Sequence, residues 1–125
     1  MTVPDDRRYT DQHEWALRID GLIRIGITDY AQEALGDVVF VDLPAVGRRF
    51  GAGETMAEVE STKSVAEIYA PCAGVVAAVN SALADAPERI NADPYGDGWF
   101  VDVTPDDPGE IDRLLDAAGY RSLIG

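Results

Sequence analysis

The strongest constraint on the fold of this chain is a pair of alternating segments that mirror each other about the dipeptide Thr62–Lys63. With this dipeptide at the centre of a turn, Val59 faces Ala66 on one side of a β-hairpin, and Glu58 faces Glu67 on the other side. A shift of one residue would bury a carboxylate, so the pattern predicts the register as well as the hairpin. Thr-Lys does not suit a type I′ turn, which favours Asn-Gly, and a type I-like or wider turn is expected.

Further short segments along the chain also have the composition and alternation of β-strands. Glycine and proline residues separate them, as is typical of a β-sandwich or barrel. Together with the two arms of the hairpin, at 55–60 and 65–70, the expected strands cover residues 15–19, 22–27, 38–43, 75–80 and 99–103.

Two helices are predicted between and after these strands. Thr28 is placed to cap a short helix over 29–35, with Gly36 just beyond its end. A second helix is expected from about residue 108 to 119, with Asp107 as its N-cap and a proline in its first turn. Its apolar stripe recurs at helical spacing and consists of Ile111, Leu114, Leu115 and Ala118.

Composition excludes several classes of function. The chain has 10 basic and 23 acidic residues and a formal net charge of −13, which would repel nucleic acid and anionic membranes and favours partners with basic or polar docking faces. Its 125 residues suit one domain, and a single cysteine, Cys72, excludes an internal disulfide. No apolar run approaches the ~20 residues that span a bilayer. The first ten residues resemble neither a signal nor a transit peptide, and a cytoplasmic location is expected.

The only lysine of the chain is Lys63, at the tip of the predicted hairpin. A lysine that forms Schiff bases needs a lowered pKa, whereas the nearby Glu58, Glu60 and Glu67 favour the charged ammonium. Such an amine is a poor spontaneous nucleophile but can be acylated by a dedicated enzyme. From this stretch alone an ordinary solvated lysine is the simpler interpretation, and a modification site is the alternative.

Several motifs along the chain occur together in one known family. The sequence resembles that of the glycine cleavage system H proteins from Tyr9 to Tyr120, with agreement in the order and spacing of separate motifs. These motifs are HEW at 13–15, IGITDYAQEALGDVVFVDLP at 25–44, ESTKS at 60–64, YAPCAG at 69–74 and INADPYGDGW at 90–99.

The resemblance implies a fold. Family members resemble other lipoyl and biotinyl carriers, which are mainly β with short helices and form a barrel-sandwich of two small sheets. The implied organisation is a single lipoyl-carrier domain over residues 1–125, with a core from about 9 to 104 and the C-terminal helix at about 108–119.

The resemblance also implies a covalent cofactor. In the family the lysine of the E-S-x-K motif carries lipoic acid in amide linkage, and Lys63 matches that lysine. In lipoylated domains generally, the acid three residues before the lysine and the glycine eleven residues after it help the attaching enzyme to recognise the hairpin. Glu60 and Gly74 occupy these positions.

Family members fold the loaded arm into a surface cleft, where an acid can hold the terminal ammonium by a charge-assisted hydrogen bond. Glu14 and Glu67 match positions near that cleft, and a solvated strand acid is an equally open interpretation of Glu67. The chain departs from the family at two places. Gln12 stands where serine is common, and Ala34 stands where histidine is common.

The role implied by the resemblance is that of a non-catalytic shuttle, expected to be monomeric when free. A glycine decarboxylase with pyridoxal phosphate would load the aminomethyl group onto the arm. An aminomethyltransferase would pass the one-carbon unit to tetrahydrofolate, and dihydrolipoamide dehydrogenase would reoxidise the arm. A lipoate-attaching enzyme would supply the cofactor beforehand.

Other functions are compatible with parts of the same sequence. A lipoyl relay protein, which hands its lipoate to other enzymes, would share every motif above. A lipoyl domain of a 2-oxo acid dehydrogenase would lack the HEW motif and the C-terminal helix, and a biotinyl carrier usually has methionines beside the lysine. A small enzyme with Glu14 and Glu67 as its carboxylate pair lacks other catalytic groups. His13 alone is poor evidence for a metal, and Trp15, Trp99 and Cys72 are interpreted as core residues.

Overall fold

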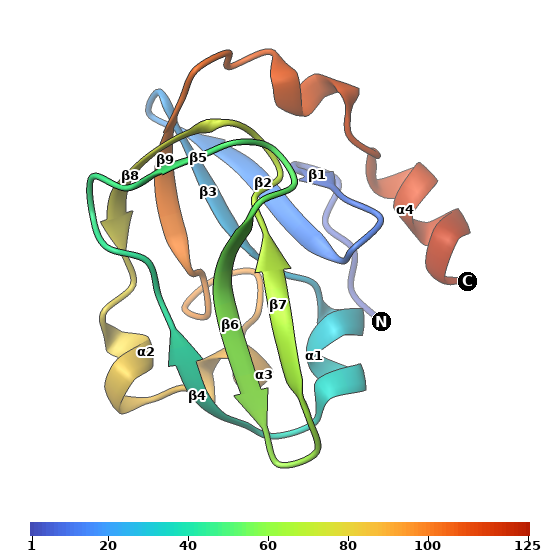
Figure 1. Ribbon diagram of the computed structural model, residues 1–125. Helices are drawn as coiled ribbons and strands as arrows, with labels where there is room; N and C mark the ends of the chain where they lie inside the picture. The colour runs from blue at the N-terminus through green and yellow to red at the C-terminus, as the bar shows by residue number, and fades with distance from the viewer.

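The computed structural model describes residues 1–125, which form two antiparallel β-sheets with short helices at their edges (Figure 1). The larger sheet has six strands in the order β1-β2-β3-β9-β8-β5, and the smaller has three in the order β4-β6-β7. The strands of the larger sheet are β1 Arg8–Tyr9, β2 Glu14–Ile19, β3 Leu22–Ile27, β5 Arg49–Phe50, β8 Gly74–Val79 and β9 Val101–Pro105. Those of the smaller sheet are β4 Val38–Asp42, β6 Thr55–Ser61 and β7 Val65–Tyr69.

The predicted mainly-β, sandwich-like fold is confirmed, with one difference in its proportions. The resemblance implied two small sheets, whereas the larger sheet here has six strands. Neither sheet closes on itself into a barrel. Both sheets contribute to one apolar cluster, because each turns alternate side chains inward. Fully or almost fully buried members of this cluster include Ile25, Val59, Ile68, Val76, Phe100 and Val101.

The helix over 29–35 is also confirmed, as α1 (Asp29–Leu35). The Thr28 hydroxyl accepts a hydrogen bond from the backbone N–H of Ala31 at 3.2 Å, which satisfies one of the free donors at the helix start. At the other end, Gly36 has φ +78° and donates its N–H to the carbonyl of Gln32 at 3.0 Å. Two single-turn helices, α2 (Ala82–Asp85) and α3 (Arg89–Ala92), follow β8. No helix of the chain is long and apolar enough to cross a membrane.

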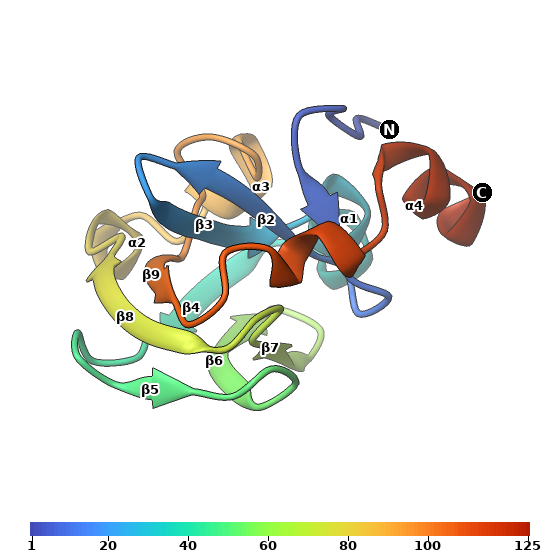
Figure 2. The same cartoon turned by 90° about the horizontal axis from the view of Figure 1, so that it is seen from above.

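The predicted helix from 108 to 119 is wrong in its bounds. Only a 3-10 helix, Glu110–Arg113, forms in the first part of that span. The C-terminal α-helix, α4, covers Ala117–Ile124 and so begins close to where the predicted helix should end. Figure 2 shows α4 set to one side of both sheets, next to the N-terminal segment.

A strand-like pairing interrupts the predicted helix. Leu115 exchanges two backbone hydrogen bonds with Tyr9 of β1, at 2.8 and 2.9 Å, and this extended geometry is incompatible with a helix through residue 115. The side chain of Asp116 then caps α4 by accepting from the N–H of Gly119 at 2.8 Å. Gly119 therefore lies in the first turn of a helix rather than after the last.

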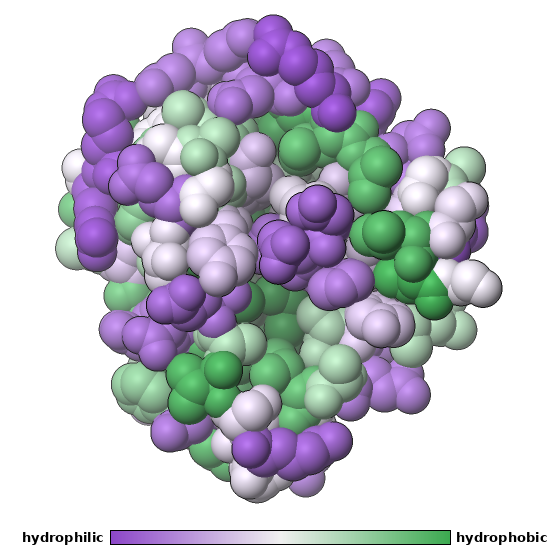
Figure 3. Space-filling view, turned by 45° about the vertical axis from the view of Figure 1, so that its right-hand side comes forward, coloured by the Kyte–Doolittle hydropathy of each residue, from purple (hydrophilic) through white to green (hydrophobic).

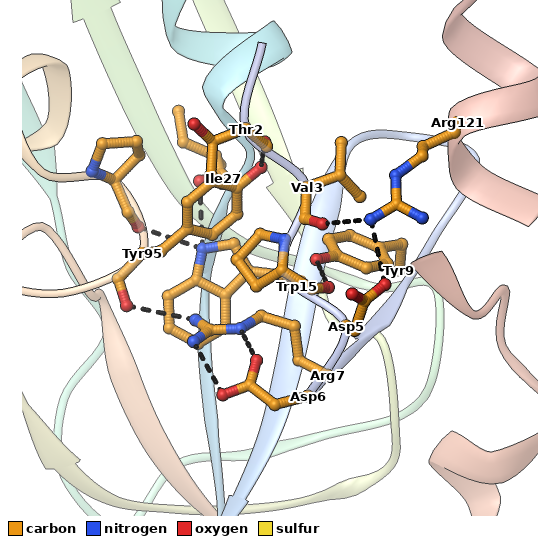
Figure 4. A network of polar contacts seen from close by, with 12 residues as sticks. Thr2, Val3, Asp5, Asp6, Arg7, Tyr9, Trp15, Ile27, Tyr95 and Arg121 are labelled. Carbon is orange, nitrogen blue, oxygen red and sulfur yellow. Dashed lines mark hydrogen bonds and ion pairs between the residues drawn. The ribbon is translucent and has the colours of Figure 1, made fainter. Parts of the chain in front are cut away.

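The N-terminal segment is tied to the body of the protein by polar contacts shown in Figure 4. The guanidinium of Arg7 lies 4.6 Å from the centre of the Trp15 ring and donates to the carbonyl of Tyr95 at 3.1 Å. Arg121 of α4 donates to the carbonyl of Val3 at 2.8 Å. The segment thus connects β2, the loop before β9 and the C-terminal helix, which lie far apart in the sequence.

Candidate functional site

The β6–β7 hairpin has the register predicted from the sequence. Val59 pairs with Ala66, and Glu58 pairs with Glu67. Val59 is fully buried, whereas both glutamates are exposed, because the alternation turns every second side chain into the core. The body of the hairpin is therefore fixed by packing, and its tip extends into solvent at the bottom of Figure 1.

Ser61 organises the turn at the tip. Its backbone N–H donates to the carbonyl of Ser64 at 2.8 Å, and its hydroxyl oxygen accepts from the N–H groups of Lys63 and Ser64, both at 3.1 Å. The N–H of Thr62 donates to the carbonyl of Asp37, just before β4, at 3.0 Å. Neither Thr62 nor Lys63 has a positive φ, which excludes a type I′ turn, as expected. The backbone that carries Lys63 is thus well anchored.

The side chain of Lys63 itself is exposed, and its amine has no hydrogen bond or ion pair within the chain. The lysine stem crosses Gly36 at the end of α1 so closely that a Cβ at residue 36 would lie 2.7 Å from Cε of Lys63. Gly36 therefore leaves room for the stem between the hairpin tip and α1. An enzyme approaching from solvent can reach this amine without any rearrangement of the core.

The other two residues of the expected attachment motif lie in different surroundings. Glu60 is exposed on β6, three residues before the lysine. Gly74 is buried at the start of β8 in the larger sheet, and Figure 1 shows β8 in the upper part of the molecule, away from the hairpin tip at the bottom. A Cβ at Gly74 would come within 2.5 Å of Cγ1 of Val103. Close packing against β9 is by itself a sufficient reason for glycine here.

A cleft of about 280 Å³ lies between α1 and β7, beside the lysine. This volume is just below the range usual for small-molecule sites, and the lining is mostly apolar. In Figure 3 the apolar floor is visible as green atoms in a hollow in the lower half of the molecule, with polar residues around it. The cleft is lined by Gln12, His13, Ile27, Tyr30, Ala31, Ala34, Leu35, Ser64, Ala66, Glu67 and Ile68.

His13 forms one wall of the cleft, a position that sequence reasoning missed. It has φ +71° in a tight loop, and its ring lies 4.7 Å from the ring of Tyr30. Its Nδ1 is 2.8 Å from the hydroxyl of Tyr120, which in turn is 2.7 Å from the hydroxyl of Thr28. Burial lowers the pKa of His13, so the imidazole is neutral at pH 7.

Glu67 and Glu14 stand in different relations to the cleft. Glu67 is exposed at the cleft mouth, and its carboxylate accepts a hydrogen bond from the Tyr69 hydroxyl at 3.1 Å. Glu14 is 1% exposed and does not line the cleft. Its carboxyl group accepts from the Thr10 hydroxyl at 2.6 Å and from the backbone N–H of Tyr69 at 3.3 Å. The structure therefore brings Lys63, Glu60 and Glu67 to one hairpin and holds Glu14 beneath the surface.

The sequence model of one family, described as the glycine cleavage H-protein, matches residues 7–125 of the chain. This chain belongs to the glycine cleavage H-protein family. The glycine cleavage system H protein of Thermus thermophilus is 53% identical over 124 residues, covering 99% of this chain and 97% of its own length. That of Nocardia farcinica is 56% identical over 128 residues, covering 98% and 97%. The crystal structure of an H protein from Mycobacterium marinum superposes with a TM-score of 0.91 at 46% identity, covering 98% and 99%.

Both departures from the H-protein pattern noted in the sequence, Gln12 and Ala34, line the cleft. The chemistry of the cleft wall thus differs from that expected, whereas the hairpin motif is intact. Ala34 is small and apolar, and it leaves neutral His13 as the only imidazole of the cleft and of the chain.

Burial of Glu14 predicts a measurable dependence of stability on pH. Burial raises the pKa of Glu14 above its ordinary value of 4.5, more than the hydrogen bonds from Thr10 and Tyr69 lower it. The folded state therefore binds a proton more tightly than the unfolded state, and this stabilisation is lost as pH rises from 4.5 through the folded-state pKa. We expect Glu14→Gln to remove this dependence, because the amide does not ionise.

The measurement is urea unfolding of the wild type and of Glu14→Gln between about pH 4 and about pH 8. The free energy of unfolding of the wild type, relative to the variant, should fall across this range. Glu33→Gln, at an exposed position of α1, is the matched control and should leave the pH profile unchanged. If the difference in free energy of unfolding between the wild type and Glu14→Gln did not change with pH, a raised pKa for Glu14 would be contradicted.

Proposed function

We propose that this chain is the lipoyl-bearing shuttle of a glycine cleavage system, with lipoic acid attached to Lys63. The observation that carries the proposal is a sole lysine, exposed and free of internal partners, at the tip of a rigid hairpin in a member of the H-protein family. A carrier needs a fixed base and a mobile arm, because tethering raises the local concentration of the arm at each docked enzyme. The packed hairpin body and the free lysine side chain meet both needs.

The residues around Lys63 fit a covalently attached acyl arm. The free amine is available for an amide bond, and the apolar α1–β7 cleft beside it is large enough for a small apolar group. When bound, lipoate supplies a dithiolane that accepts the aminomethyl group and electrons. Glu67 at the cleft mouth would hold a protonated amine by a charge-assisted hydrogen bond, and neutral His13 lines the same cleft.

A contact of Glu14 with the end of the arm is part of the proposal as a second contribution. This contact requires the buried carboxyl group of Glu14 to turn away from Thr10 or Tyr69, which hold it by hydrogen bonds outside the cleft lining. Glu60 and Gly74 retain their proposed part in recognition by the attaching enzyme. For Gly74 the effect would be indirect, through the packing of β8 on β9, because the residue is buried.

The proposed partners follow from this role. They are a glycine decarboxylase with pyridoxal phosphate, an aminomethyltransferase with tetrahydrofolate, dihydrolipoamide dehydrogenase and a lipoate-attaching enzyme. We propose further that residues 1–125 act as one non-catalytic carrier unit, monomeric when free. The cytoplasmic location expected from the sequence belongs to the same proposal.

Reconstitution tests the proposed function directly. The lipoylated chain is combined with the decarboxylase, the aminomethyltransferase, the dehydrogenase, glycine, tetrahydrofolate and NAD. Glycine-dependent formation of NADH is expected to require the chain and to vanish with its unlipoylated form, because no other component carries the one-carbon unit between enzymes. Equal NADH formation with and without the chain would refute the proposal.

A further inference from the structure

The exposed face of the three-stranded sheet carries two ordered rows of side chains across β4, β6 and β7, given by the strand register. In the row nearer the hairpin tip, Phe40 pairs with Glu60, and Glu60 pairs with Val65. The members of the second row, in the same strand order, are Asp42, Glu58 and Glu67. We call this surface the outer face. It ends at the turn that carries the lysine.

The first row exposes large apolar side chains on both sides of Glu60. Phe40 is 56% exposed and Val65 is 57% exposed. Together with the acids Asp42, Glu58 and Glu60 they line a shallow hollow of about 200 Å³. Exposed apolar side chains that gather around one hollow, with polar residues between and beside them, mark interaction sites, and aromatic residues are frequent anchors of interfaces.

The charges of the outer face are uncompensated within the chain. None of the four carboxylates on it, those of Asp42, Glu58, Glu60 and Glu67, forms an ion pair with an arginine or the lysine. In the second row the three acids lie directly opposite one another on neighbouring strands, and such like-charge pairs destabilise a sheet. A partner with lysine or arginine side chains around an apolar pocket would relieve this repulsion and cover Phe40.

We propose that the outer face is the docking surface for the lipoate-attaching enzyme, which would bind it through an apolar pocket ringed by basic residues. This proposal rests on the proposed function. The attaching enzyme must hold the Lys63 nitrogen itself within bonding distance of an acyl carbon, so it needs a firm contact with the rigid sheet beside that residue. Enzymes that act on the far end of a flexible arm do not need a firm contact with the sheet beside Lys63. Two copies of the chain would bring like charges together, which disfavours self-association through the same face.

The reaction that this docking serves is an acyl transfer. The amine of Lys63 loses its protons to solvent or enzyme and attacks the carboxyl carbon of activated lipoate, either an acyl adenylate or a thioester. A C–N amide bond forms, the C–O or C–S bond breaks, and AMP or the thiol leaves with the bonding electrons. No oxidant or reductant is required.

The test is the rate of lipoate attachment to three variants, measured by intact mass with a purified ATP-dependent lipoate–protein ligase, lipoate and ATP. Phe40→Ser is expected to lower kcat/KM about tenfold, mainly through KM, since it removes the aromatic anchor of the outer face. Val65→Thr keeps a β-branched residue in the strand and should give a smaller loss in the same direction. Val46→Ser is the matched control, because Val46 is 60% exposed but lies outside the outer face, and its kcat/KM should equal that of the wild type.

Salt dependence tests the charge argument separately. Attachment to the wild type should slow as salt concentration rises, and the double variant Asp42→Asn/Glu58→Gln should show a flatter dependence. Far-ultraviolet circular dichroism and urea unfolding confirm that each variant is folded. The apolar argument stands if only Phe40→Ser and Val65→Thr are slow, and the charge argument is overturned if the salt slopes are equal.

Three outcomes would overturn the proposal as a whole. The first is an unchanged kcat/KM for both apolar variants while the wild type is lipoylated, which leaves the proposed function intact. The second is a loss of kcat/KM for dihydrolipoamide dehydrogenase, acting on the lipoylated variants, that equals the loss for lipoate attachment. Such a result would make the outer face a general docking surface. The third is a wild-type dimer in sedimentation velocity that Phe40→Ser dissociates. A wild type that takes up no lipoate at all would instead refute the proposed function.

Discussion

Lys63→Arg is expected to abolish covalent lipoylation completely. Arginine preserves the positive charge at the hairpin tip, but its guanidinium does not form the amide that an amine forms with an activated carboxyl group. No other side-chain amine exists in the chain, because Lys63 is the only lysine. Intact mass after expression in a lipoate-competent host should show one lipoyl adduct on the wild type and none on the variant.

A register variant provides the control for this result. Thr62→Lys/Lys63→Arg moves the amine by one residue within the same exposed turn, where it remains accessible to solvent. We expect no adduct, because the attaching enzyme must meet the amine in the geometry set by the bonds to Ser61. An adduct that survives in Lys63→Arg would reject the assignment of the attachment site, and the N-terminus would be the remaining amine.

Gly74→Ala is expected to cause the largest loss of stability among the variants considered. A Cβ at this position would collide with the backbone oxygen of Thr104 and with Cγ1 of Val103, and neither neighbour lies at the end of a flexible side chain. Overpacking of this kind costs about 3 kcal/mol, equivalent to a fall of ~10 °C in Tm for a chain of this length. Thermal and urea unfolding measure both quantities.

Gly47→Ala separates packing from backbone strain. Gly47 has φ +92° but nothing within 4 Å of an added Cβ, so only the strain of about 1 kcal/mol applies.

Lipoylation of Gly74→Ala, measured well below its Tm, then distinguishes two explanations for the glycine at position 74. A normal rate in the folded variant assigns the residue to packing, whereas a slow rate supports a part in recognition. If Gly74→Ala were as stable as the wild type, the packing argument would be contradicted.

The hairpin was predictable because its information is local. The alternation around Val59 and Ala66 fixes both the faces and the register, and no distant residue is needed to choose between alternatives. The helix after Thr28 was predictable for the same reason, since the cap Thr28 directly precedes the helix and Gly36 directly follows it. The sandwich-like architecture followed from the number of short strands and the turns between them.

The C-terminal segment was not predictable from local pattern. An apolar stripe at Ile111, Leu114 and Leu115 fits a helix, but the same side chains serve a 3-10 helix followed by a strand-like bridge. The pairing of Leu115 with Tyr9, more than a hundred residues away in the chain, decides between these structures. Tertiary contacts override local propensity here, and no signal in the segment itself records them.

The α1–β7 cleft was missed as a set of residues for a related reason. Its walls come from the loop before β2, from α1 and from β7, and only the fold brings these together. The resemblance points to Glu67, whereas a lone histidine in the sequence gives no sign that His13 forms part of a cleft. The positive φ of His13 and its contact with Tyr120 have no signature in the sequence.

The hydroxyl of Tyr120 has a consequence for engineering the end of this protein. It is fully buried in α4 and bridges the back of His13 to Thr28, so the last helix acts as a brace behind the cleft. A fusion partner joined after Gly125 leaves this brace in place. A truncation before residue 117 would leave an imidazole and a hydroxyl without their shared partner, and the damage would appear in the wall of the cleft that α4 supports.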